Sequence, residues 1–79
     1  MQAVPEGINI DEIKTSLEKI ENVHEVEHIH VWQLDDKKKF FEAHILLSSV
    51  EHESAKEKVR HMLENDFGIS HSTIETKEI

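Results

Sequence analysis

Seven histidines and seventeen acidic residues are the side chains of this 79-residue chain that could do chemistry. The sequence has no cysteine, so disulfides and thiolate metal sites are excluded. The ligand types that remain for a divalent metal are imidazole nitrogen and carboxylate oxygen. The informative question is therefore which histidines lie beside which carboxylates.

Glu27 and His44 are the pair that an expected hairpin brings together. The polar run Asp35–Lys38 separates two stretches rich in β-branched and aromatic residues, a pattern typical of two strands joined by a turn. A turn centred on the first two residues of that run sets Glu27 opposite His44. A shift of the turn by one whole residue still leaves both on the same face of the sheet.

A third strand beside the second can bring Glu75 or His71 next to His44. Three ligands on three adjacent strands, with a water in the fourth position, would suit zinc. The competing interpretation of any single histidine here is a packed or hydrogen-bonded strand side chain. It applies most to His28 and His30, which this register places on the core-facing side, and both rank below His44 as metal ligands.

Catalysis has no comparable support in the sequence. No spacing supports a Ser-His-Asp arrangement, no HExxH is present, and two glycines are too few for a phosphate-binding loop. His52 and His61 fall on opposite sides of the expected second helix and cannot hold one metal together. We therefore expect a binding module and not an enzyme.

Five elements in the order αββαβ must position these residues. Apolar residues spaced by three, four and three positions predict an amphipathic helix with Asn9 as its N-cap. A second helix follows, with Ser49 as its N-cap or with Glu51 as its first residue, and with Gly68 at its C-terminal end. The expected elements are a helix at 10–21, strands at 25–34 and 40–48, a helix that ends at 67, and a strand at 69–77.

This order predicts an α+β fold, a two-layer sandwich in which two helices cover one face of a three-stranded mixed sheet. The third strand should lie beside the second and parallel to it. The hairpin residues expected to face the core are Val26, Trp32, Leu34, Phe41, Ala43, Ile45 and Leu47. Those expected on the open face are Glu25, Glu27, Ile29, Val31, Glu42, His44 and Leu46.

The charge and the small size of the chain bear on its partners. A formal net charge of −8 excludes nucleic acid, because phosphate binding needs a positive face. A domain this small buries little apolar surface, and one sheet face stays uncovered, so we expect a homodimer. The longest apolar run, Ile45–Leu47, is far shorter than the roughly 20 residues that span a bilayer. No basic region is followed by an apolar stretch, so we expect no signal peptide.

Four motifs in order resemble the cytoplasmic C-terminal domain of cation diffusion facilitator transporters. The segment 23–32, Val-His-Glu-Val-Glu-His-Ile-His-Val-Trp, is similar to the family pattern Val-x-x-Val-His-x-Leu-His-x-Trp. Residues 4–8 resemble the segment that follows the last membrane helix, and Ala-His-Ile at 43–45 resembles the second strand. Phe-Gly-Ile-Ser-His-Ser-Thr-Ile-Glu at 67–75 resembles the closing Gly-Ile-x-His-x-Thr-Ile-Gln. The resemblance covers nearly the whole chain.

The resemblance implies an αββαβ fold of ferredoxin-like or metallochaperone-like type, a homodimer, and a role in sensing cytosolic metal. A carried-over metal site would consist of Glu27, His44 and Glu75. Glu27 stands where the family has its first histidine, Glu75 where it has glutamine or histidine, and Lys77 at a later acidic position. This carboxylate-rich set makes manganese or iron conceivable beside zinc.

The expected function is that of a metal-sensing and dimerisation domain of a divalent cation efflux transporter, on the cytoplasmic side of the membrane. Residues 1–8 would be a lead-in after the last membrane helix, and 9–79 the regulatory domain, soluble as a fragment. Trp32 is expected to serve packing or the dimer interface. The alternatives are a metal-independent structural dimerisation module of the transporter and a free-standing soluble metal-binding relative.

Overall fold

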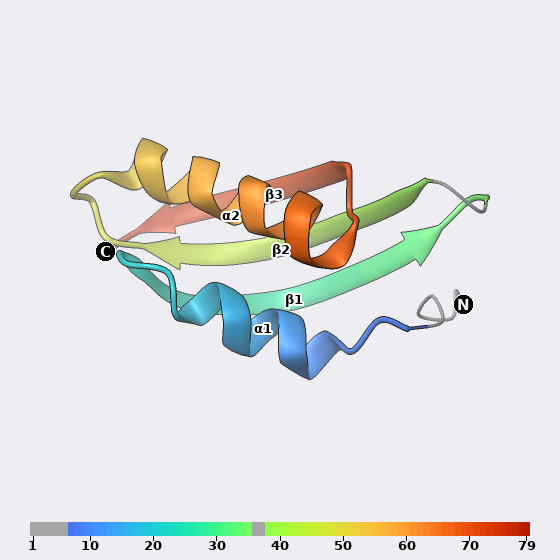
Figure 1. Cartoon of the computed structure of the whole chain (residues 1–79). Coiled ribbons are helices and arrows are strands. Elements are labelled where there is room, and N and C mark those ends of the chain that lie inside the picture. Colours follow the sequence, from blue (N-terminus) through green and yellow to red (C-terminus); the bar gives the residue numbers. More distant parts are fainter. Residues whose placement is uncertain (1–6, 36–37) are drawn as a thin grey trace.

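The computed structural model describes residues 7–35 and 38–79, so most of the expected lead-in and the middle of the hairpin turn lie outside the described residues. The elements are α1 (Ile10–Glu18), β1 (Val23–Gln33), β2 (Lys39–Leu47), α2 (His52–Phe67) and β3 (His71–Glu78). β2 is the middle strand of one sheet, antiparallel to β1 and parallel to β3 (Figure 1). The expected αββαβ order and the parallel third strand are confirmed.

The helix ends follow local capping chemistry. The Asn9 side chain accepts a hydrogen bond from the backbone N–H of Glu12, as expected of an N-cap. α1 stops at Glu18, three residues earlier than predicted, and the chain leaves through tight turns to Asn22 at φ 73°. α2 begins at His52, close to the later of the two expected starts, and Glu51 before it makes no side-chain cap. The helix ends at Gly68 with φ 68°, the left-handed conformation that favours glycine.

Both helices cover the same face of the sheet. A single cluster of buried side chains from the two helices and the strands shows this arrangement. α1 contributes two residues of this cluster, α2 three, and β2 the alternating set that runs from Phe41 to Leu47. Their members are Ile13, Leu17, Ala55, Val59, Leu63, Phe41, Ala43, Ile45 and Leu47. The intervening residues of β2, from Phe40 to Leu46, are exposed or half-buried. They lie on the uncovered side of the sheet, which is the open face of the domain.

A β-bulge interrupts the regular pairing of β1. Glu27 pairs with His44, but the next pair is His30 with Glu42, so His28 and Ile29 together face a single residue of β2. His28 adopts φ 55°, a left-handed conformation that costs a non-glycine residue about 1–2 kcal/mol. The extra residue shifts every later side chain of β1 to the opposite face.

The face assignments predicted for the second half of β1 are therefore wrong. Val31 is buried at 5% exposure and Ile29 packs against the core, where the sequence placed both on the open face. Trp32 and Leu34, expected in the core, are half-buried and 67% exposed respectively. Side chains alternate between the two faces of a strand with a period of two residues. One inserted residue therefore puts every following side chain on the face opposite to the predicted one.

Lys14 and Glu18 fasten α1 to the edge of the sheet at Val26. Lys14 Nζ donates to Glu18 Oε2 at 2.7 Å and to the Val26 carbonyl oxygen at 2.6 Å, and the Val26 N–H donates to Glu18 Oε2 at 3.0 Å. β1 is an edge strand, so these bonds satisfy backbone groups that β2 does not reach. The hydrogen bonds from Lys14 and from Val26 hold the pKa of Glu18 below its ordinary value. The same bond to Glu18 raises the pKa of Lys14.

Replacing Glu18 with glutamine should lower the free energy of unfolding by about 1 kcal/mol at pH 7, since water screens this half-exposed pair. A carboxyl whose pKa falls on folding stabilises the protein above its unfolded pKa, and that stability is lost as pH drops through the folded pKa. Denaturant titrations should therefore show the wild-type advantage at pH 7 and its loss below the ordinary glutamate value of 4.5. Glu21→Gln, an equal charge change at an exposed residue, is the control. A Glu18→Gln deficit that is the same at pH 3 and pH 7 would contradict this role.

Candidate metal-binding face

Glu27, His44 and Glu75 form a row across the middle of the open face. His44 is the register partner of Glu27 on β1 and of Glu75 on β3. Neighbouring strands lie about 4.8 Å apart, so the three side chains stand side by side on three strands. The structure thus places both carboxylates beside His44, as the sequence predicts.

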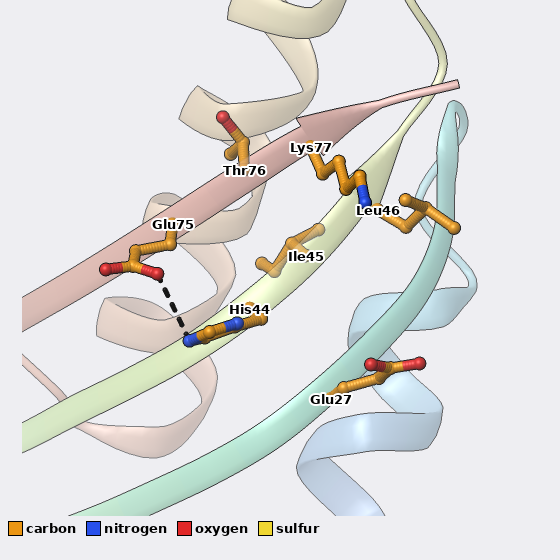
Figure 2. A pocket seen from close by; sticks show the side chains of 7 residues that line it. All are labelled: Glu27, His44, Ile45, Leu46, Glu75, Thr76 and Lys77. Carbon is orange, nitrogen blue, oxygen red and sulfur yellow. Dashed lines mark ion pairs between the residues drawn. The ribbon is translucent and has the colours of Figure 1, made fainter.

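His44 and Glu75 are in direct contact. The distance from His44 Nε2 to Glu75 Oε2 is 3.2 Å, and Figure 2 shows the two side chains turned toward each other, with Glu27 on the opposite flank of His44. The side chains of His44 and Glu75 are 52% and 71% exposed, so both can change rotamer without disturbing the core. An open pocket of about 390 Å³ holds this row, and it is lined by Glu27, His44, Ile45, Leu46, Glu75, Thr76 and Lys77.

The bulge adds His28 to this part of the face. The ring centres of His28 and His44 lie 5.0 Å apart at an interplanar angle of 65°, and His28 Nε2 is 3.8 Å from Glu27 Oε2. His30 pairs with Glu42 one row further along the sheet. The expectation that His28 and His30 face the core is wrong, because both lie at or beyond the inserted residue and are exposed.

His71 does not lie beside His44. The parallel register pairs His71 with Phe40, and their rings stack at 4.8 Å and 17°. Phe40 stacks in turn on Trp32 at 5.6 Å and 10°. These three rings form an aromatic row at the other end of the open face, and the expectation of His71 as a neighbour of His44 is wrong. Trp32 stacks on Phe40 on the open face and does not lie in the core, where the sequence had placed it.

His52 and His61 lie on α2, apart from the row, and Lys77 lies beside it. His52, at the start of α2, is 3.2 Å from Glu53 and 3.3 Å from Glu78, so it ties α2 to the end of β3. Lys77 lines the same pocket as His44 and places a positive charge there. His61 is exposed on α2.

The donor chemistry of the row fits a divalent cation, although its donor atoms do not point at one centre. Among residues 7–35 and 38–79, no three histidine or acidic side chains converge at distances that would already hold a metal ion. An imidazole flanked by two carboxylates nevertheless supplies the nitrogen and oxygen ligands that zinc, manganese and iron accept. The exposure of the side chains leaves room for the movement that convergence requires.

The fold and this face define a class of protein: a small αββαβ sandwich whose uncovered sheet face presents imidazole, carboxylate and aromatic side chains. The family model ZT_dimer, the cytoplasmic domain of cation efflux proteins, matches residues 5–78. The chain belongs to this family, as the motifs had indicated. No helix in the described part of the chain is long and apolar enough to cross a bilayer.

Curated relatives are transporters of which this chain matches one part. It is 40% identical over 78 residues to a probable proton-coupled zinc antiporter of Bos taurus. The aligned region covers 95% of this chain and 18% of the relative. It is 29% identical over 79 residues to a probable zinc transporter protein of Dictyostelium discoideum, and that aligned region covers 99% of this chain and 14% of the relative. The chain thus spans less than a fifth of the length of either relative.

Solved structures share the fold at low sequence identity. The metal-bound C-terminal domain of the CzcD transporter from Cuprividus metallidurans superposes with a TM-score of 0.79 at 19% identity, over 89% of this chain and 99% of that one. The Zn form of the transporter CzrB gives a TM-score of 0.78 at 15% identity, over 99% of this chain and 93% of that one. Both confirm the two-helix, three-strand α+β fold.

Proposed function

We propose that this chain is the metal-sensing and dimer-forming cytoplasmic domain of a divalent cation efflux transporter, with a binding role and no catalytic one. The observation that carries the proposal is the row on the open face, where His44 is flanked on both neighbouring strands by a carboxylate. Membership of the cation efflux family supports the part of the proposal that assigns the domain to a transporter. Residues 1–8 would lead in from the last membrane helix, and 9–79 form the regulatory domain.

In this proposal each residue of the row has a defined task. His44 offers a neutral nitrogen, and Glu27 and Glu75 offer oxygens from either side. A divalent cation supplies the positive charge that draws these exposed carboxylates together. Zinc is the first metal to test, since the two curated relatives described above carry zinc in their names and the CzrB structure is a Zn form. Manganese and iron accept the same ligands.

The open face is also the surface that a second copy would cover. Two protomers of net charge −8 repel each other, and a cation bound among carboxylates near their interface would offset part of that repulsion. Binding to the associated form then stabilises it by mass action. In the full transporter this would link the cytosolic metal level to the positions of the two membrane domains.

A metal-independent dimerisation module is the second candidate, and the aromatic row favours it. Trp32, Phe40 and His71 stack on the open face, and such a surface can bury apolar area against a partner without a cation. The two candidates differ in whether association responds to metal.

His44→Ala should weaken zinc binding by more than tenfold, or about 1.4 kcal/mol, in calorimetric titration of the purified domain. The physical reason is the loss of the nitrogen that lies between the two carboxylates. His61→Ala, at an exposed position on α2, is the matched control and should bind zinc like the wild type. Equal affinities of the His44 and His61 variants would remove His44 from the site.

Zinc should also tighten the dimer. Sedimentation equilibrium at micromolar protein should give a dimer whose association constant is higher with zinc than with EDTA, because bound cation relieves repulsion between protomers. Equal constants in the two buffers would favour the metal-independent module. A monomer under both conditions would contradict both candidates.

A further inference from the structure

We propose that His28 is a second imidazole ligand of the His44 site, delivered to the open face by the β-bulge, and that it raises the preference of the site for zinc over manganese. This inference rests on the proposed function. In a regular strand His28 would point toward the core. The spacing of the sequence alone therefore places it on the core-facing side and away from the metal site.

The backbone supports a specific role for the bulge. His28 holds φ 55° in the interior of an eleven-residue strand, next to Glu27, the partner of His44 on β1. Ile29 packs against the core, so the bulge keeps the apolar side chain inside while it leaves the imidazole on the open face. Left-handed conformations of non-glycine residues are uncommon and concentrate at functional sites.

The side-chain contacts join four ligand groups in one chain across the sheet. Glu27 Oε2 is 3.8 Å from His28 Nε2, the rings of His28 and His44 meet edge to face, and His44 Nε2 is 3.2 Å from Glu75 Oε2. The 67% exposure of the His28 side chain leaves it free to reorient. In the described structure, then, His28 lies close to both Glu27 and His44.

The separation of the two rings fits a shared zinc ion. A zinc–nitrogen bond of about 2.0–2.1 Å puts the centre of each imidazole ring about 3 Å from the metal. Two such rings bound at the tetrahedral angle have centres about 5 Å apart. The ring centres of His28 and His44 lie 5.0 Å apart. Rotation about the side-chain bonds of these exposed residues would aim one nitrogen of each ring at a common point.

The chemistry of the site changes with this residue. Without His28 the row offers one nitrogen and two carboxylates, a set that manganese accepts well. With His28 it offers two nitrogens and two carboxylates, and imidazole ligands favour zinc over manganese. His28 would thereby restore nitrogen to a site in which strand β1 otherwise provides only Glu27.

The test compares His28→Asn and His28→Gly with His24→Asn in the whole domain. Asparagine and glycine both tolerate positive φ, so each variant keeps the bulge and removes only the imidazole. His24 is an exposed histidine of the same strand and serves as the control. Zinc and manganese affinities are measured by calorimetry, and zinc-dependent shifts of the imidazole nitrogens are followed by NMR.

We expect both His28 variants to bind zinc at least tenfold more weakly, to lose less affinity for manganese, and to melt within a few degrees of the wild type without metal. The His28 ring nitrogens of the wild type should shift on zinc addition together with those of His44. Wild-type zinc affinity in both His28 variants, with His44→Ala still defective, would overturn this inference and leave the proposed function standing. A wild type that binds no zinc would overturn both.

Discussion

Two short helices can bury only one face of a three-stranded sheet, and the rest of this structure depends on that limit. α1 has 9 residues and α2 has 16, and their apolar stripes meet a single set of inward-facing strand residues. The chain places its buried residues in that one layer, and no polar or charged residue of the described part is buried there. The other face must then tolerate water or a partner, which is why imidazole, carboxylate and aromatic side chains gather on it.

β1 is where the demands of folding and of the candidate site meet. Val26 is held from outside by Lys14 and Glu18, Glu27 stands in the candidate metal-binding row, and His28 begins the bulge. These three consecutive residues combine an anchored backbone, a candidate ligand and a strained turn of the chain. A ligand between two fixed points loses less freedom when it binds, so the anchor on one side and the bulge on the other favour a defined position for Glu27.

The sequence predicted the neighbours of a strand residue correctly in some parts of the sheet and not in others. Glu27 faces His44 as predicted, but the turn does not set this pair: next to the turn Val31 pairs with Phe41, one residue out of the predicted register, and the bulge restores the predicted pairing. The core positions of β2 were predictable because its apolar residues alternate regularly. Beyond the bulge the prediction failed for Val31 and Trp32, since hydrophobic alternation does not show an inserted residue.

The parallel register of β3 was harder to predict. A sixteen-residue helix joins β2 to β3, so the packing of α2, and no turn, decides that Glu75 and not His71 stands opposite His44. The contribution of His28 depends on a single positive φ angle, which no spacing rule contains. The family resemblance implied the candidate ligand positions and a dimer, and the structure shows which side chains lie beside those positions.

Crystals of the zinc-loaded domain, measured on both sides of the zinc absorption edge, test most directly whether the open face is the metal-binding surface. The account predicts an anomalous peak within bonding distance of His44, with at least one of Glu27 and Glu75 turned toward it. A peak found only on α2, or no peak in crystals grown with equimolar zinc, would contradict it.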